Sequence, residues 1–446
     1  MTDIPDSVDR TINYISRSIT LKILTIGILI LLLLIPALMI QNIIRERQNR
    51  RDSVVSEINQ KWGNSQIVTG PFITAPFKSF YKDIKGETQF NLKYLHILPE
   101  TLSIAGEIDP EKRHRSLFET VVYNAKLKVD GNFKIPASGQ LNIDSNNIIW
   151  EKAYLAVGIT DMRGIEDKID IRFNGAVHNT NPGLKTNDIA PAGVSTQVDL
   201  SSIKENGKFS FILNLKGSDR IAFIPVGESN TVDIKSSWPS PGFDGAFLPD
   251  KHLINKGGFS ADWKVLHLNR NYPQFWEGRQ YEVSSSSFGV KLILMADSYQ
   301  RSMRLAKYAV MFLFFTFASF FFSEVINKQK IHPIQYILIG IAILIFYTLV
   351  LSLSEHMNFN VAYILSSVSV TLIISGFAKA IVKSKKFACM IMAILVVLYG
   401  YLFIVLQLED YALIMGSIGL LVITATVMFM TRKINWYKIE TVNVES

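Results

Sequence analysis

The densest group of side chains that could do chemistry lies in residues 236–269, SSWPSPGFDGAFLPDKHLINKGGFSADWKVLHLN. Its carboxylates and imidazoles could form a metal or acid–base site, and its aromatic rings could form a platform for a sugar or a peptide. The spacing matches no metal-ligand motif, and Trp and Phe at turn-rich strand ends usually fill a core. We therefore favour a structural segment that also offers a contact surface. The contact candidates are Trp238, Asp244, His252 and Trp263, accompanied by Asp250, Asp262, His267, Phe243 and Phe247.

Two smaller groups of charged residues are also candidates. Asp161 and Arg163 could form a charged pair at a strand end, although their spacing favours a turn with a local ion pair. His332 and the neighbours Glu355 and His356 could pair across a membrane face. Positioning at the interface is a more economical interpretation of those three residues than pH sensing.

Several classes of function are excluded by what the sequence lacks. It contains no G-x-S-x-G, H-E-x-x-H, P-loop or G-x-G-x-x-G motif. The single cysteine, Cys389, excludes an intrachain disulfide and a thiolate metal site. Residues 45–304 carry 33 basic and 29 acidic groups, so the net charge of +8 is not concentrated in one basic domain that would bind nucleic acid. We predict no catalytic residue, no metal and no cofactor.

Membrane helices must position much of this chain. The 446 residues are 48% hydrophobic with a mean hydropathy of +0.22, which is too apolar for an ordinary soluble protein of this length. A spanning helix needs about 20 apolar residues. Six runs meet this requirement: residues 21–44, 305–326, 333–353, 359–381, 387–407 and 411–430. The first is longer than the apolar core of a signal peptide and no cleavage pattern follows it, so we expect a retained signal anchor.

The basic residues of the tails and short loops predict the orientation. Twelve of them fall on one side of the predicted spans and none in the short loops of the other side, although Arg45, Arg47, Arg50 and Arg51 oppose this partition. Long translocated domains largely escape the rule, so both termini are predicted to be cytoplasmic. The predicted parts are 1–44 (tail and first helix), 45–304 (periplasmic β-rich domain), 305–430 (five-helix membrane domain) and 431–446 (cytoplasmic tail).

The large external segment has the pattern of β structure. Alternation of apolar and polar residues in 169–173 and 208–215 is typical of strands with one buried face. Asp130-Gly131, Asn206-Gly207 and Asn181-Pro182-Gly183 are predicted turns. Residues 45–61 indicate a polar helix that continues from the first span. The fold class is therefore an α+β membrane protein with six transmembrane helices and a large extracytoplasmic, mainly-β, sandwich-like domain. This domain is expected to be an antiparallel sandwich or a larger two-lobed sheet assembly.

Charge placement in the spans argues against transport. Lys307, Glu324 and Lys379 lie near span ends, where a charge costs little, and the middle of every span is free of ionisable groups. A coupled carrier would normally need buried carboxylates or broken helices.

The chain resembles the CreD family of inner-membrane proteins along nearly its whole length. The resemblance lies in LLLLIPALMI (31–40), GPFITAPF (70–77), DMRGI (161–165), SSWPSPGFDGAFLP (236–249), KIHPIQYILIG (330–340), LSLSEHMNF (351–359) and TRKINWY (431–437). It implies a bacterial inner-membrane protein with a large periplasmic domain, controlled by a two-component system that answers envelope stress, and tied to the β-lactam response and colicin tolerance. The resemblance supplies no catalytic residue.

Three functions from different classes fit these observations. We favour a non-enzymatic envelope-integrity protein, anchored in the lipid bilayer, whose external domain contacts a periplasmic or peptidoglycan-associated partner. A membrane-embedded enzyme acting on lipid or cell-wall precursors would need acidic or histidine clusters near a membrane face, for which Glu355-His356 and Glu409-Asp410 are the candidates. An insertase- or chaperone-like protein would share the layout but would need a buried basic residue, which spans two to six lack.

Overall fold

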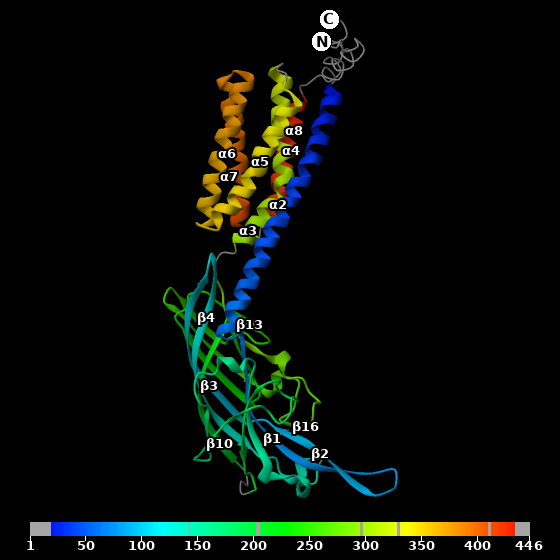
Figure 1. The fold of residues 1–446 in the computed structure, drawn as a ribbon, viewed down its shortest axis with the longest axis vertical. Coiled ribbons are helices and arrows are strands. Elements are labelled where there is room, and N and C mark those ends of the chain that lie inside the picture. Colours follow the sequence, from blue (N-terminus) through cyan, green and yellow to red (C-terminus); the bar gives the residue numbers. More distant parts are fainter. Residues whose placement is uncertain are drawn as a thin grey trace. The chain divides into compact units, whose positions relative to one another are not determined.

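The chain divides into two compact units in a computed structural model that describes residues 19–141, 143–201, 206–294, 298–327, 331–408 and 412–432. The helical unit comprises Met1–Arg50 and Ala296–Ser446, and the β unit comprises Arg51–Met295 (Figure 1). Both predicted classes of structure are present, so the α+β assignment is confirmed. The predicted tails and the loop residues 328–330 and 409–410 lie outside the described residues.

The helices coincide with the predicted apolar runs. They are α2 (Ile19–Trp62), α3 (Ser298–Lys307), α4 (Ala309–Asn327), α5 (Pro333–Ser354), α6 (Phe359–Val382), α7 (Lys385–Gln407) and α8 (Ala412–Thr431). Among the described residues, α2, α5, α6 and α7 are long and apolar enough to cross a membrane, and α3 with α4 forms a fifth candidate that is bent by 44°. The predicted second span, 305–326, thus begins at the end of α3 and consists mainly of α4, after the bend. The count of six spans stays a prediction.

Local capping explains where these helices begin and end. His332 caps α5 and Pro333 occupies its first turn, where a missing N–H costs nothing. Asn358 and Ser384 accept backbone N–H bonds at the starts of α6 and α7. Lys383 ends α6 in the left-handed conformation, with φ of 52°. The short connections therefore stop each helix near the length that a bilayer requires.

The β unit contains two sheets. The nine-stranded sheet has the order β13 (Pro241–Gly245), β17 (Phe288–Leu292), β11 (Arg220–Ile224), β1 (Gln66–Lys82), β5 (Ala153–Ile159), β9 (Gly193–Val198) and β8 (Asn181–Pro182), with β2 (Thr88–Ile97) on β1 and β16 (Phe275–Glu277) on β2. The eight-stranded sheet has the order β14 (Lys251–Asn255), β15 (Gly258–Leu266), β12 (Ser229–Ser236), β3 (Thr101–Arg115), β4 (Phe118–Lys134), β10 (Asn206–Ser218), β6 (Asp170–Phe173) and β7 (Ala176–Asn179).

One hydrophobic core contains side chains from both sheets, which is the predicted sandwich-like arrangement. The alternation predicted for 169–173 and 208–215 is confirmed, since β6 and β10 bury every second residue. Of the two predicted arrangements, the antiparallel sandwich is wrong in one respect, because β1 pairs with β11 and β3 with β12 in parallel. Each parallel pair joins strands that are more than a hundred residues apart, and local patterns cannot reveal such a crossover.

The predicted turns at Asp130-Gly131 and Asn206-Gly207 are also wrong, because the first pair lies inside β4 and the second forms the start of β10. Gly131 is needed there for close approach rather than for a turn. A Cβ at this position would lie 2.0 Å from the carbonyl oxygen of Thr101 on β3 and 2.7 Å from the ring of Phe209. A side chain at residue 131 would therefore push adjacent strands apart.

The last turns of α2 belong to the β unit, which confirms the polar helical continuation predicted for 45–61. Trp62 ends the helix beneath two cations, with Arg113 and Lys216 at 4.6 Å and 4.9 Å from its ring centroid. Its indole N–H donates to the carbonyl oxygen of Tyr123 at 3.4 Å. This aromatic anchor fixes the point at which the chain enters β1.

Candidate functional site

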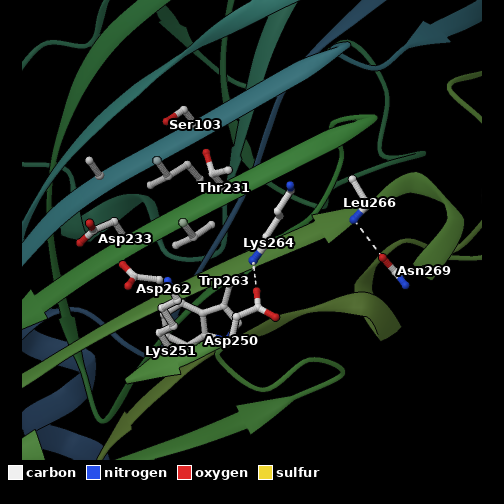
Figure 2. A pocket seen from close by; sticks show the side chains of 13 residues that line it. Ser103, Thr231, Asp233, Asp250, Lys251, Asp262, Trp263, Lys264, Leu266 and Asn269 are labelled. Carbon is white, nitrogen blue, oxygen red and sulfur yellow. Dashed lines mark hydrogen bonds between the residues drawn. The ribbon is translucent and has the colours of Figure 1, made fainter. Parts of the chain in front are cut away.

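An open polar groove lies on the outer face of the eight-stranded sheet (Figure 2). It has a volume of about 740 Å³ and runs over β3, β12 and β15. Strand alternation produces it: β12 buries Val232 and Ile234 in the core and therefore presents Thr231 and Asp233 outward. We call this outer surface the polar face.

Small side chains form the floor of the groove and charged side chains form its sides. Ser103 and Ala105 on β3 lie opposite Thr231 and Asp233 on β12, and these in turn lie opposite Lys264 and Asp262 on β15. On β3, therefore, no outward side chain in the groove is large enough to fill the space. The groove is lined by Ser103, Ile104, Ala105, Thr231, Val232, Asp233, Asp250, Lys251, Asp262, Trp263, Lys264, Leu266 and Asn269.

The arrangement of charge in the groove is costly for folding alone. Asp233 and Asp262 stand directly opposite each other on neighbouring strands, and like charges in that position destabilise a sheet. Lys251 faces Asp262 from β14, and Asp250 accepts a hydrogen bond from the backbone N–H of Lys264 at 2.7 Å. Figure 2 shows the neighbouring carboxylates of Asp233 and Asp262 on one side of Trp263 and the Lys264 side chain on the other. Such a surface suits a polar ligand that carries groups of both signs.

The polar face extends beyond this groove. A second depression of about 410 Å³ includes Glu107, Lys126, Lys128 and Lys235. A third, of about 510 Å³, includes Lys168, Asp170 and Arg172. Among the described residues, no group of three or more His, Cys, Asp or Glu side chains could hold a metal ion.

The aromatic residues predicted as a contact surface lie mostly in or against the core. Trp263 is only 2% exposed, its ring packs edge-on against Phe243, and its N–H donates to the carbonyl oxygen of Phe247 at 3.3 Å. Trp238 is half-buried and donates to the carbonyl oxygen of Ile293 at 3.1 Å. The carboxylate-rich part of 236–269, rather than its aromatic part, reaches the groove.

The two polar contact candidates of that segment lie apart from the groove. Asp244 lies on β13 of the other sheet and accepts from the guanidinium of Arg220 at 2.9 Å and 3.0 Å. His252 lies on β14, is exposed, and packs its ring against Phe243 with 5.4 Å between centroids. The structure does not bring Asp244 and His252 into one site with Asp233.

Asp161 and Arg163 form the turn with a local ion pair that the sequence favoured. Asp161 caps the short 3-10 turn Met162–Gly164, and its carboxylate accepts from the Arg163 guanidinium at 2.7 Å and 2.9 Å. It also accepts from the backbone N–H of Asn64 at 2.9 Å. Together, the guanidinium and these backbone donors hold the pKa of Asp161 well below its usual range. The pair therefore fastens the start of β1.

Among the three candidates near the membrane, the full length of α5 separates His332 from the neighbours Glu355 and His356. His332 caps its beginning, where the imidazole Nδ1 accepts from the N–H of Ile334 at 3.3 Å. Glu355 follows its end and accepts from the hydroxyl of Tyr299 at 3.0 Å, with Arg47 at 4.0 Å. His356 is exposed. Because 22 helical residues span about 33 Å, pairing of His332 with Glu355 or His356 is contradicted. The other predicted acidic pair, Glu409-Asp410, lies outside the described residues.

A hydroxyl–imidazole–carboxylate arrangement was missed by sequence reasoning. The Thr74 hydroxyl lies 3.1 Å from Nδ1 of His96, and the Asp188 carboxylate lies 2.9 Å from Nε2. The order resembles that of a hydrolase triad, but His96 has no exposed surface and Thr74 is also buried, so no substrate can reach the hydroxyl. Burial lowers the pKa of His96, although the Asp188 carboxylate acts to raise it. The spacing of these residues gives no local signal.

A buried charge in the helical unit was also missed. Glu324 is 7% exposed, forms an ion pair with Lys22 of α2, and accepts from the Tyr336 hydroxyl at 3.2 Å and the N–H of Ile331 at 3.1 Å. The expectation that Glu324 stands where a charge costs little is therefore wrong. Its position near the end of α4 concealed a partner that lies about 300 residues earlier in the chain.

Comparison with known proteins gives matches along nearly the whole chain. The profile of the family described as Inner membrane protein CreD matches residues 18–437. The chain is 31% identical over 416 residues to the Inner membrane protein CreD of Escherichia coli (strain K12), covering 92% of this chain and 91% of that protein. The apolar helices and the match over nearly the full length agree on a multi-pass location in the inner membrane. The chain belongs to the CreD family of inner membrane proteins.

Proposed function

We propose that the protein is a non-enzymatic envelope-integrity protein that acts by binding through the polar face of its β unit. The groove on that face is the observation that carries the proposal. Asp233 and Asp262 remain opposed there at a cost to sheet stability, which a bound ligand with positive groups would offset. Lys251 and Lys264 provide the matching contacts for negative groups.

The chemistry of the groove selects the kind of partner. Carboxylates and ammonium groups repeat across neighbouring strands, which lie about 4.8 Å apart, and the floor of Ser103 and Ala105 admits an extended chain. The peptide stems of peptidoglycan carry both amino and carboxyl groups along an extended backbone. They are therefore the partner that we propose.

Among the described residues, two arrangements with groups that could do catalytic chemistry favour binding instead. The Thr74–His96–Asp188 arrangement is closed to substrate. The groove presents charged side chains without a nucleophile and a base in contact. An enzyme acting on lipid or cell-wall precursors is the alternative, and the experiment below distinguishes the two.

The proposal includes the predicted orientation, with the β unit in the periplasm and both termini in the cytoplasm. Two ion pairs within the helical unit support the alternating up-and-down direction of its helices. Lys22 meets Glu324 near the end of α4, and Arg47 approaches Glu355 after the end of α5. The beginning of α2 therefore lies at the same face of the helical unit as the end of α4, and Arg47 lies at the face where α5 ends.

A triple variant of the groove tests the function. Asp233→Asn, Asp262→Asn and Lys264→Gln remove the charges and keep the side-chain sizes. The full-length variant is expected to bind isolated peptidoglycan less tightly and to restore stress tolerance only partly in cells that lack the natural protein. Glu151→Gln with Lys152→Gln, exposed charges outside the polar face, is the matched control and should behave as the unchanged protein.

Two outcomes would contradict the proposal. One is a triple variant that is normally abundant and fully functional with unchanged peptidoglycan binding. The other is complete loss of function from one substitution in a stably folded protein, with accumulation of a soluble metabolite. The second result would replace binding with the enzyme alternative.

A further inference from the structure

The hairpin of β1 and β2 extends beyond the rest of the nine-stranded sheet (Figure 1). Its two strands pair from Ile73 with Ile97 to Lys82 with Thr88. Within the described part of the chain, β5 pairs with β1 only as far as Thr74, and β16 pairs with β2 only from Leu95. Residues 78–93 therefore form a two-stranded arm, which we call the arm.

One face of the arm is apolar and flanked by lysines. Phe80 and Phe90 are direct cross-strand partners with ring centroids 6.0 Å apart, and they are 53% and 52% exposed. The pair of Lys78 and Leu92 lies next to them on the same face, and the Lys78 ammonium is 5.3 Å from the Phe90 centroid. The opposite face carries the alternate residues Ser79, Tyr81, Gln89, Asn91 and Lys93.

The tip of the arm is an ordered turn that presents another apolar residue. The Asp83 carboxylate accepts from the backbone N–H groups of Lys85 and Glu87, both at 2.9 Å. Gly86 takes the positive φ of 83° that the turn requires. Ile84 is fully exposed between these fixed residues. The turn thus holds an aliphatic side chain and the neighbouring Lys85 at the furthest point of the hairpin.

This exposure has a physical cost. A two-stranded hairpin is only marginally stable in water, and an exposed cluster of large apolar side chains usually marks a surface that contacts a partner. The arm carries the four lysines Lys78, Lys82, Lys85 and Lys93. Two acidic residues, Asp83 and Glu87, leave a net charge of +2, and the Asp83 carboxylate is engaged in the turn.

We propose that the arm binds the surface of a phospholipid bilayer that contains anionic headgroups. Ile84, Phe80, Phe90 and Leu92 would enter the boundary between headgroups and acyl chains. Lys78, Lys82 and Lys85 would contact phosphates, whereas Lys93 lies on the opposite face and pairs with Glu277 at 3.7 Å. This site is separate from the polar face and does not depend on peptidoglycan binding.

Two other partners fit the arm less well. A sugar needs polar groups beside the aromatic platform to bond its hydroxyls, and the apolar face offers two lysines and the Thr88 hydroxyl but no carboxylate or amide. A protein strand could add to a free edge, but lysines spaced along an edge strand oppose such pairing. A lipid surface requires the combination that the arm has, which is apolar bulk with positive charge around it.

Vesicle flotation of the full-length protein tests the proposal. The protein is placed in nanodiscs of neutral phosphatidylcholine and mixed with vesicles of phosphatidylcholine, with or without phosphatidylglycerol. Capture is expected only by the anionic vesicles. Lys78→Gln with Lys82→Gln should weaken it by about fivefold for each lysine removed. Phe80→Ser with Phe90→Ser should weaken it by about tenfold or more.

Matched controls come from the other sheet. Lys126→Gln with Lys128→Gln removes two lysines from the polar face, and Val177→Ser with Ile212→Ser removes two exposed apolar side chains there. Both controls should be captured as well as the unchanged protein. The lysine pair keeps the test valid if the phenylalanine variant fails to fold, because its substitutions are confined to exposed positions.

A probe at the tip tests insertion directly. Replacing the single cysteine by Cys389→Ser allows Ile84→Cys to be labelled with an environment-sensitive dye. Its emission should rise and shift to shorter wavelength with anionic vesicles, whereas a dye at Leu253→Cys, exposed on the β14 strand, should not change.

Three results would overturn the proposal: no capture by anionic vesicles, equal capture of unchanged and arm-variant proteins, or equal capture by neutral vesicles. Capture of the unchanged protein by peptidoglycan that is lost only in the arm variants would assign the arm to a glycan instead. Loss of peptidoglycan binding in the groove variant, with vesicle capture intact, would show that the two sites are independent.

Discussion

The contacts of the buried His96 imidazole are clear in the structure, but no local sequence pattern predicts them. Both ring nitrogens have partners, Thr74 on β1 and Asp188 in the segment between β8 and β9, and the ring packs near Trp276 with 5.9 Å between centroids. The three polar groups satisfy one another inside the core, which is what burial of polar side chains requires. The arrangement therefore stabilises the sheet at the base of the arm rather than attacking a substrate.

His96 should make the stability of the β unit depend on pH. Burial depresses its folded-state pKa below the ordinary value of 6.5, so the unfolded chain binds the proton more readily. The contribution of neutral, buried His96 to the free energy of unfolding is fully present above pH 6.5. It is lost as the pH falls from there through the folded-state pKa. The free energy of unfolding should fall by up to about 1.4 kcal/mol per pH unit in that window.

Chemical denaturation of the β unit at several pH values measures this slope. His96→Gln should remove it, because an amide can bond to the same neighbours without titrating. His267→Gln, at a histidine that is only partly buried, is the control and should keep it. A slope that persists in His96→Gln would show that another group is responsible.

Among the elements, α2 is unusual in serving two environments with one continuous helix. Its beginning is apolar, its end is polar, and Pro36 lies inside it without ending it. The stretch of α2 in the helical unit has an ion pair near each of its ends: Lys22 pairs with Glu324, and Arg47 approaches Glu355. In the β unit, its last residue, Trp62, packs under Arg113 and Lys216. The sequence of each stretch matches the unit to which it belongs.

The ion pair of Lys22 and Glu324 should show strong coupling in a double-mutant cycle. Lys22→Met or Glu324→Gln alone leaves a charge without its partner in a buried site, which costs about 3–5 kcal/mol in fully buried pairs and less where one partner is partly exposed. The double variant should recover part of this loss, because it buries no unpaired charge. Thermal unfolding of the full protein in nanodiscs is the measurement.

The pair of Lys61 and Glu57, exposed at the other end of α2, supplies the control. Its coupling should be no more than about 0.5 kcal/mol, as for other surface pairs at this spacing. A coupling of similar size at Lys22 and Glu324 would mean that the contact between α2 and α4 does not depend on the ion pair.

At the scale of the whole molecule, orientation in the membrane is the property on which the proposed function depends. Peptidoglycan is accessible only if residues 45–304 lie outside the cytoplasm. Reporter fusions at Gly183 and Glu440 should report opposite sides, with Gly183 in the periplasm, because the basic residues of the tails and short loops favour the cytoplasm. The same side for both fusions would refute the topology and, with it, the proposed partner.

The sequence by itself determined the helical ranges, the alternation of β6 and β10, the polar continuation of α2 and the turn at Asp161. Each of these depends on side chains that are close together in the chain, through periodicity, capping or composition. The resemblance to the CreD family likewise depends on short, contiguous sequence segments.

Only the tertiary structure decided the parallel pairs, the interior place of Gly131, the Thr74–His96–Asp188 arrangement and the partner of Glu324. It also decided that the groove would form where β3, β12 and β15 meet, although its lining residues extend from Ser103 to Asn269. These features arise from strand order and register, which are set by the packing of one core shared by both sheets. A local pattern gives the face that a residue occupies, but the neighbour it meets there depends on contacts far away in the chain.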